Sequence, residues 1–456
     1  MNFARVILFY FVIQIAALVS IAQSALVSGP MLGQIELRSA KIWIEVKPGS
    51  TADLWYWKQG RMQEAQRIRQ TTDAAQWFAP LTFTIGGLEV NTTYEYQIIA
   101  EPQATQRKPT HADGLFTTKD LWQWRKPVPD FSFLAGSCAY FNEPPYDRPG
   151  RPYGGDSSIF ETMAKENAAF MLWLGDNWYT REVDYFDAWG MWYRASRDRS
   201  SPVLRNFLKA MPHYAMWDDH DYGPNDIGKH FILKETAREV FSKYWANPSY
   251  GMQGQGVYSI VSYGDVDIFM MDDRWWRSAD NMPDSINGQP NPNKQMWGKE
   301  QMEWLKNALL YSRAPFKIIA NGSQILNPAS PFDKLANCPA EYQELMSFLQ
   351  ANRINGVLFM SGDRHHSEVI KVDRPGQYPL YDITVSPLTS GTHRFGGPEK
   401  DNPYRVYGLD EKQNYGKISV TGERNKRKLT VAFFGVKGEA LGEWAVSEND
   451  LKVPRN

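Results

Sequence analysis

The stretch FMLWLGDNWY, residues 170–179, decides the fold of this chain because an apolar run ends directly in a polar cluster. The run at 170–174 is typical of a buried strand in an α/β domain. Asp176 and Tyr179 follow it, behind the turn residue Gly175. Ligands of open α/β sheets bind beyond the carboxyl ends of the strands, so the stretch predicts a functional site at that edge.

Four other apolar runs end in the same way. They occupy residues 131–134, 213–217, 316–320 and 357–360. The polar residues that follow them are Cys138, Asp218, Asp219, His220, Asp221, Asn321, Gln324, Asp363, Arg364, His365 and His366. A single cluster of this kind is usually a turn or a solvated loop, but five clusters at equivalent strand ends favour one shared site.

Helical patterns separate several of these runs. Residues 130–456 are therefore expected to form an α/β layered domain that closes with a β-meander. Lys126, Pro127 and Pro129 oppose regular structure just before it, so residues 121–129 predict a linker.

The amino-terminal part has a different pattern. Residues 40–46 and 94–98 alternate apolar and polar side chains with a period of two, which is typical of half-buried strands. Residues 25–120 therefore predict a sandwich of about seven strands in the style of an immunoglobulin or fibronectin type III domain. We expect this module to buttress its larger neighbour.

The first 24 residues resemble an export signal. Arg5 precedes an apolar run at 6–19, and the small residues Ser20, Ala22 and Ser24 follow it. The alternative is a transmembrane anchor, but the run is short for a bilayer span. We expect cleavage of residues 1–24 and an exported protein, periplasmic or secreted, without a transmembrane anchor in its mature form.

Composition excludes several classes of protein. Across 456 residues, 50 basic side chains face 51 acidic ones, for a net charge of −1. Nucleic acid is not an expected structural partner, because phosphate-backbone binding needs a clustered cationic surface. Two cysteines, Cys138 and Cys338, cannot form a disulfide framework. We expect a monomer whose partner is a small molecule or a lipid or glycolipid.

The clustered residue types are those that bind metal ions. Asp176 and Tyr179 are close enough for one turn to direct a carboxylate and a phenol at one site. A phenolate suits a hard, highly charged ion such as Fe(III), whereas carboxylate and amide oxygens also suit Ca, Mg or Mn. His365 can add an imidazole nitrogen, and Asp363 can face the same edge.

Four motifs together resemble those of the PhoD-like alkaline phosphatases, a branch of the calcineurin-like, purple-acid-phosphatase-like metallophosphoesterases. The resemblance covers nearly the whole chain, including the amino-terminal module. It implies a four-layer α/β/β/α core, a binuclear site that often holds iron with calcium, and hydrolysis of phosphate mono- or diesters. The motifs are Gly175-Asp176-x-x-Tyr179, Trp217-Asp218-Asp219-His220-Asp221, Asp272-x-Arg274-x-x-Arg277 and Ser361-Gly362-Asp363-x-His365.

The resemblance also implies roles for single residues. Asp176 matches the carboxylate that bridges the two metals, Cys138 the leading ligand of the first metal, and Tyr179 the phenolate on the ferric ion. Asp219 takes the place of a second-metal asparagine, and His220 matches the histidine that assists turnover. Asp363 and His365 match a late ligand pair in which Asp replaces the first imidazole.

One departure concerns the second metal. The sequence has no His between residues 266 and 340 for its remaining imidazole, so Asn321 or Gln324 is expected to supply an oxygen instead. Oxygen ligands favour Ca over Zn at that position, and we expect Fe(III) with Ca, with Zn, Mn or Mg as alternatives. Cys138 has three interpretations, a ligand, a disulfide partner of Cys338 or an inert core thiol, and its position at a strand end favours the ligand.

Arg364 and Arg274 are candidates for phosphate contacts, with structural salt bridges as the alternative. Trp178 is a candidate substrate contact, whereas packing is the expected role of most tryptophans near the site. The sequence therefore favours metal-dependent phosphoester hydrolysis, assisted by His220, with mono- and diesters both open. The alternatives are an exported binding protein with structural metals, and a phosphotriesterase or carboxylesterase on the same site.

Overall fold

The computed structural model describes residues 24–102 and 109–454. The predicted signal segment, residues 1–24, lies outside the described residues except for Ser24. Among the described residues, no helix has the length and apolar character that a bilayer crossing requires.

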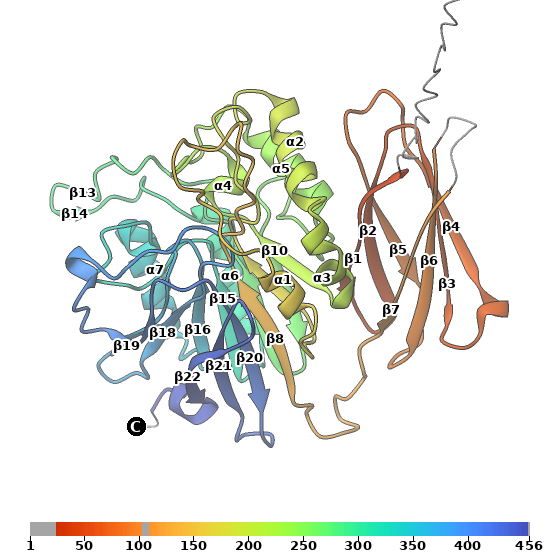
Figure 1. Ribbon diagram of the computed structural model, residues 1–456. Coiled ribbons are helices and arrows are strands. Elements are labelled where there is room, and N and C mark those ends of the chain that lie inside the picture. Colours follow the sequence, from red (N-terminus) through yellow and green to blue (C-terminus); the bar gives the residue numbers. More distant parts are fainter. Residues whose placement is uncertain (1–23, 103–108, 455–456) are drawn as a thin grey trace, which may run out of the picture.

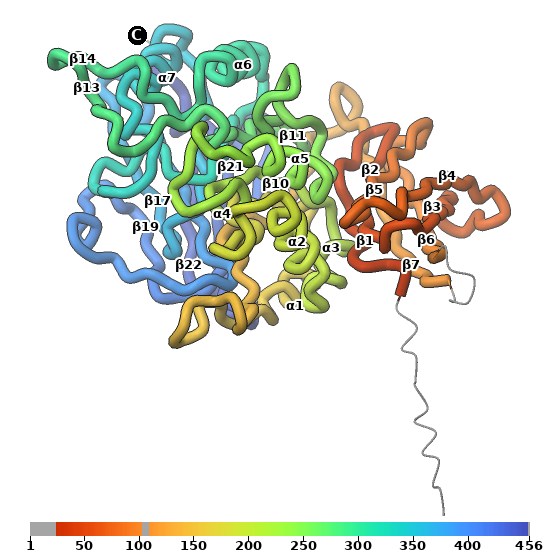
Figure 2. The backbone as a smooth tube through the Cα atoms, turned by 90° about the horizontal axis from the view of Figure 1, so that it is seen from above, coloured from red at the N-terminus to blue at the C-terminus, as the bar shows by residue number. Residues whose placement is uncertain are grey.

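Residues 26–117 form two antiparallel sheets, drawn in red and orange in Figures 1 and 2. The first sheet has the order β1-β2-β5 and the second the order β4-β3-β6-β7. Burial alternates strictly along β6, which places one face of the second sheet on an apolar core shared with the first. The strands are β1 Leu26–Ile35, β2 Ser39–Val46, β3 Thr51–Lys58, β4 Gln66–Thr71, β5 Ala79–Gly86, β6 Thr93–Glu101 and β7 Thr110–Thr117.

The larger part contains two mixed sheets. One has the order β10-β9-β8-β20-β21-β22 and the other β11-β12-β15-β16-β18-β17-β19. The strands are β8 Phe131–Gly136, β9 Met171–Leu174, β10 His213–Met216, β11 Ser259–Tyr263, β12 Val266–Met270, β15 Phe316–Ala320, β16 Val357–Ser361, β17 Ser367–Val372, β18 Leu380–Thr384, β19 Arg405–Leu409, β20 Asn414–Thr421, β21 Lys428–Gly435 and β22 Ala440–Ser447. A two-stranded ribbon, β13 Ser285–Ile286 and β14 Gln289–Pro290, projects beside them (Figure 1).

Helices lie beyond these sheets. They are α1 Ile159–Met163, α2 Ala188–Arg199, α3 Arg205–Ala210, α4 Asp219–Tyr222, α5 Lys234–Tyr244, α6 Gly298–Tyr311 and α7 Pro339–Ala351. Successive residues of β9 enter different apolar cores, because side chains alternate across a strand. Leu172 packs with residues of the second mixed sheet, whereas Trp173 packs with residues of α1, α2, α3 and α5.

The two-sheet unit is joined to the larger part by hydrogen bonds. The Trp43 indole donates to the backbone oxygen of Lys243 at 2.7 Å. The buried Glu45 carboxylate accepts from Ser196 Oγ at 2.7 Å and from Tyr244 OH at 2.9 Å. The unit therefore rests against the ends of α2 and α5.

The two mixed sheets meet closely at the edge where β9, β10, β15 and β16 end. Gly362 follows β16, and a Cβ there would lie 2.4 Å from the backbone oxygen of Leu174 at the end of β9. The Gly362 amide donates to the Gly322 oxygen at 2.8 Å, which links the turns after β15 and β16. Only glycine permits this approach, so the polar turns of both sheets come to one edge.

Candidate metal centre

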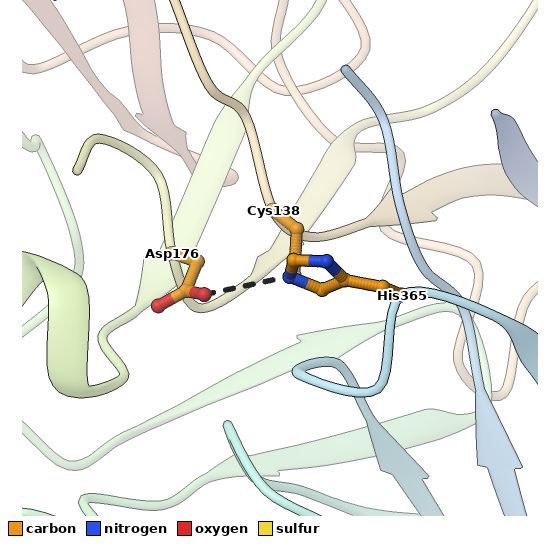
Figure 3. A group of neighbouring side chains, drawn as sticks. All are labelled: Cys138, Asp176 and His365. Atoms are coloured by element: carbon orange, nitrogen blue, oxygen red, sulfur yellow. Dashed lines mark hydrogen bonds between the residues drawn. The ribbon is translucent and has the colours of Figure 1, made fainter. Parts of the chain in front are cut away.

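Three turns bring Cys138, Asp176 and His365 together. Cys138 follows β8, Asp176 follows β9 and His365 follows β16, and all three side chains are buried. One potential ligand atom from each lies within 4.8 Å of the others. Figure 3 shows the three side chains approaching from separate segments. The sequence prediction of one shared edge therefore agrees with the geometry of these three residues.

Tyr179 joins this group through His365. Its hydroxyl lies 3.2 Å from Nε2 of His365, whereas Nδ1 of the same ring lies 3.0 Å from the hydroxyl of Tyr153. The Cys138 Sγ donates to Asp176 Oδ2 at 3.6 Å. A thiol, a carboxylate, a phenol and an imidazole nitrogen thus face one another, which is the set predicted for the first metal.

A second group shares Asp176. Ligand atoms of Asp176, Asp219 and His220 also lie within 4.8 Å of one another. The two groups contain five residues, and together with Tyr179 we call them the rim cluster, which comprises Cys138, Asp176, Tyr179, Asp219, His220 and His365. Because Asp176 is common to both groups, it is placed to serve two neighbouring cations.

The segment Asp218–Asp221 is shaped by its own carboxylates. The Asp218 carboxylate caps the short helix α4 by accepting from the Asp219 amide at 2.9 Å. The Asp221 carboxylate accepts in turn from the Asp218 amide at 3.0 Å. Asp221 also accepts from the Asn177 amide at 3.0 Å. Asp221 therefore holds the turn after β9 to the turn after β10 and Asp218 caps the helix, while Asp219 and His220 remain for the rim cluster.

The backbone at the cluster is strained. Cys138, Asp176, Asp363 and His365 have φ values of 61°, 53°, 64° and 57°, in the left-handed region that L-residues rarely adopt. Such conformations cost ~1 kcal/mol or more each and persist where the surroundings fix them. Their concentration in the rim turns indicates side-chain placement that is maintained against a local energetic cost.

The charges of the cluster fit a cation. Burial raises the pKa of Cys138, and the charge of Asp176 raises it further. Burial likewise raises the pKa of Asp176, with Asp219, Asp221 and Asp363 adding to the shift, and burial and Asp176 raise the pKa of Tyr179. Buried acids repel one another in this way until a positive charge compensates them.

The nitrogen ligands complement these acids. Burial and the neighbouring His393 lower the pKa of His365, which keeps its imidazole neutral, the form that binds metals. Burial also lowers the pKa of His220, although Asp219 opposes this shift. Asp219 is the exception among the acids, because His220 and Arg274 outweigh burial and lower its pKa. The donor set therefore suits one or two hard cations.

Asp363 lies at the edge of the cluster. Its carboxylate is 4.0 Å from Nη1 of Arg364 and a quarter exposed, and burial raises its pKa to about 7. Among the described residues it belongs to neither group of three ligands, although its charge raises the pKa of Asp176.

The structure does not give Asn321 and Gln324 the predicted ligand role. The amide oxygen of Asn321 accepts from the Trp297 indole at 2.9 Å, and its amide nitrogen donates to Asp273 at 3.0 Å. The amide oxygen of Gln324 accepts from Asn327 at 2.9 Å, and its amide nitrogen donates to Glu368 at 2.8 Å. Both amide oxygens, the predicted ligand atoms, therefore already accept a hydrogen bond from another side chain.

The two predicted phosphate-binding arginines are held by carboxylates. Nε of Arg274 donates to Asp218 Oδ1 at 2.7 Å, and its Nη2 contacts the same oxygen. Nη2 of Arg364 donates to Glu399 at 2.9 Å. Each retains one buried nitrogen, Nη1 of Arg274 and Nε of Arg364, for which the described residues supply no hydrogen bond. The salt-bridge alternative therefore describes their observed contacts.

Packing corrects the prediction for Trp178, and the two free thiols remove one of the alternatives for Cys138. Trp178 is only 1% exposed and stacks with Trp245 at 6.4 Å between ring centroids, so it belongs to the apolar core and not to a substrate surface. Cys138 and Cys338 are both free and buried, which excludes the disulfide between them. Cys338 instead packs in the core of the larger part.

Sequence reasoning missed Tyr153. It lies in the long segment between β8 and α1, and its ring contacts those of Tyr140, Tyr179 and His365. Gly155, two residues later, donates to the Thr389 oxygen at 2.7 Å, which fixes the segment over the rim cluster. The tandem Gly154-Gly155 was the one local signal, because glycines permit close backbone approach.

Comparison with known proteins gives a consistent result. A family model described as PhoD-like phosphatase matches residues 133–431. Alkaline phosphatase D of Bacillus subtilis (strain 168) is 23% identical over 326 residues, which are 62% of this chain and 52% of that protein, so the chain spans about half the length of this curated relative. A solved structure described as the structure of PhoD matches with a TM-score of 0.72 at 19% identity, covering 93% of this chain and 90% of that chain. This last likeness shows the fold alone.

Proposed function

The chain belongs to the PhoD-like phosphatase family, and from this premise we propose that it hydrolyses phosphate esters at the rim cluster. The observation that carries the proposal is the shared position of Asp176 between two groups of potential ligands. Such a carboxylate can hold two cations close together, and a cation pair polarises a phosphoester and activates water.

We infer separate roles for the cluster residues. Cys138, Tyr179 and His365 would hold a first cation, Asp219 and Asp363 would hold a second, and Asp176 could serve both. Thiolate, phenolate and imidazole ligands suit Fe(III), whereas the carboxylates suit Ca, with Zn, Mn or Mg as alternatives. Asn321 is left out of this ligand set because its amide is already hydrogen-bonded to Trp297 and Asp273.

The chain's own polar groups complete the reaction. His220 Nδ1 is buried and has no hydrogen-bond partner among the described residues, so the neutral ring that burial favours can use this nitrogen to hydrogen-bond an oxygen of the ester. Arg364 contacts a phosphate oxygen through its unpartnered Nε. Arg274 acts through Asp218, which caps the helix that carries Asp219 and His220.

The same family resemblance extends to the architecture. We propose that residues 130–456 form a four-layer α/β/β/α metallophosphoesterase domain, and residues 25–120 a fibronectin III-like sandwich joined to it by residues 121–129. The two antiparallel sheets of residues 26–117 support the second assignment. Residues 1–24 are proposed to act as a cleaved signal, which makes the mature protein an exported monomer.

The test combines elemental analysis with a substrate panel. We expect the purified chain to carry metal and to cleave an aryl phosphate monoester or diester, with loss of activity on chelation. The His220→Ala variant should lower kcat while metal content stays near that of the unmodified protein. Inactivity towards every ester under several metal regimes would favour the non-catalytic binding protein, and cleavage of triesters or carboxylesters alone would favour the rival hydrolases.

A further inference from the structure

A groove of about 920 Å³ lies between the two-sheet unit and helices α1 and α3, and it contains no residue of the rim cluster. One wall is the outer face of β3, β6 and β7, and the other is formed by residues of α1, of α3 and just after α1. The junction of the two parts is seen in Figure 1. A cavity of this size accepts an organic ligand larger than an ion.

The strand register builds the first wall. Trp57 of β3 lies opposite Glu95 of β6, and Glu95 lies opposite Leu115 of β7, so the three side chains form one row. The Trp57 indole donates to Glu95 Oε2 at 2.6 Å, which fixes the orientation of the ring. Leu115, on the far side of Glu95 from the ring, is 54% exposed, and the lining residue Met62 is 65% exposed. The wall thus presents an aromatic ring of fixed orientation together with exposed apolar side chains.

Apart from Glu95, the charged and amide side chains of the groove lack hydrogen-bond and ion-pair partners among the described residues. Among the described residues, no hydrogen bond or ion pair is made by the side chains of six lining residues, which are Gln97, Asp113, Glu161, Lys165, Asn206 and Lys209. They include two amides, two carboxylates and two ammonium groups, so both donors and acceptors point to the same space. Gln97 and Lys209 are half-buried and the other four are exposed, so all six side chains are free to contact a ligand.

The charged side chains that line the groove argue against an anionic polymer as its ligand. Glu95, Asp113 and Glu161 outnumber Lys165 and Lys209, so the groove has no net positive charge and does not suit a phosphate polymer. A saccharide matches the lining better, because its hydroxyl groups both donate and accept hydrogen bonds while the C–H face of a sugar ring stacks on an indole. We propose that this groove binds a neutral oligosaccharide, with one sugar ring on Trp57.

This binding function is independent of the proposed hydrolysis. It would hold the enzyme on a glycan through the two-sheet unit, which gives that unit a role beyond support of its neighbour. Because the groove contains no residue of the rim cluster, saccharide binding and ester cleavage can be lost separately.

The experiment titrates the full chain with cellohexaose, chitohexaose and maltohexaose by calorimetry, with an uncharged extended octapeptide and inorganic phosphate as further probes. We expect at least one hexasaccharide to bind and Trp57→Ala to weaken that binding ~10-fold or more, as the loss of an aromatic contact does at a binding hot spot. The matched control is Trp124→Ala, which removes a tryptophan that is 91% exposed and lies outside the groove. This control should leave the affinity unchanged.

Two measurements keep the result unambiguous. Aryl phosphate cleavage by Trp57→Ala should equal that of the unmodified chain, which shows that the variant is folded, and Trp57→Phe should keep part of the affinity because it keeps a ring. The proposal is wrong if none of the three hexasaccharides binds, if Trp57→Ala binds as tightly as the unmodified chain, or if only the peptide or phosphate binds. Loss of ester cleavage with saccharide binding intact would count against the hydrolysis alone.

Discussion

Consecutive residues His365 and His366 enter two different buried clusters of this protein, and the contrast between the clusters is instructive. His365 belongs to the rim cluster. His366 belongs to a group with Glu368 and Glu399, whose potential ligand atoms also lie within 4.8 Å of one another. We call this second group, together with Arg364 and Arg405, the arginine-paired cluster. By residue type alone, both groups qualify as metal sites.

The two clusters differ in their internal cations. Nη2 of Arg364 donates to Glu399 at 2.9 Å, and Nε of Arg405 donates to Glu368 at 2.7 Å. Burial alone would raise the pKa of Glu368, but His366 and Arg405 outweigh it and lower that pKa to about 2. The rim cluster shows the opposite, because burial and mutual repulsion raise the pKa of Asp176.

This difference separates a structural cluster from a candidate metal centre. Buried carboxylates are stable only when a positive charge or hydrogen-bond donors compensate them. Arg364 and Arg405 compensate the charges of Glu399 and Glu368, so these two arginines would repel a metal ion at that cluster. Among the described residues, no arginine or lysine forms a salt bridge with Asp176, so the rim cluster leaves room for a cation from solution.

The largest expected effect is the loss of catalysis in Asp176→Asn. Replacement of the carboxylate common to both ligand groups should reduce kcat on an aryl phosphate by more than the ~100-fold typical of an outer-sphere partner. Bound metal, measured by elemental analysis, should fall with it. Circular dichroism should show an unchanged fold, because this side chain carries little of the core. Near-normal turnover in this variant would show that Asp176 is not part of the catalytic site. The rim cluster would then no longer differ from the arginine-paired cluster in function.

The arginine-paired cluster should respond in the opposite way. Glu368→Gln leaves Arg405 without its buried partner and should lower the free energy of unfolding by ~3 kcal/mol, measured by urea denaturation. Metal content should not change. Glu368 is fully buried, and its depressed pKa means that its stabilisation is present above the ordinary carboxyl range and is lost as the pH falls to about 2. The variant should therefore lose less stability than the unmodified chain over that acid range, and loss of metal from it would contradict the structural assignment.

Much of the rim cluster could be predicted because strand ends determine it. Cys138, Asp176 and His365 each follow an apolar strand, and the carboxyl ends of neighbouring parallel strands meet at one edge. Asp219 and His220 lie in a turn of the same kind after β10. Convergence of the turns after β8, β9 and β10 needed only strand order, whereas His365 follows a strand of the other sheet and also needed the close approach of the two sheets at Gly362.

The rest depended on partners distant in sequence. The residues around Asn321 do not indicate that its amide oxygen accepts a hydrogen bond from Trp297. The residues around Arg364 likewise do not indicate that it pairs with Glu399, which comes later in the chain. Trp178 sits next to the site in sequence, yet its ring turns into the core against Trp245. Tyr153 reaches His365 from a long loop, whose path is not set by any periodic pattern.

Tyr153→Phe should have a smaller effect than either change above. The phenol is 3.0 Å from Nδ1 of His365, so its removal frees the ring that presents Nε2 to the cluster. Loss of such a supporting hydrogen bond typically weakens metal affinity by ~10-fold. Competition with a chelator measures the affinity directly, and Tyr146→Phe, an exposed tyrosine that precedes it in the sequence, is the matched control. Equal affinities in the two variants would show that Tyr153 only packs against the ring.

The smallest expected effect is the release of protons when metal binds. It tests directly whether the acids of the rim cluster are protonated while Glu368 is charged. Burial and neighbouring acids raise the pKa of Cys138, Asp176 and Tyr179, so these groups hold protons that an entering cation displaces. Calorimetry of metal binding in buffers of different ionisation enthalpy should give about one proton or more per ion at neutral pH. Cys138→Ser should release fewer protons, because a serine hydroxyl does not ionise in this range, whereas Glu368→Gln should release the same number, because Glu368 is already charged. Metal uptake without proton release would mean that the rim acids are compensated from within the chain, as Glu368 and Glu399 are.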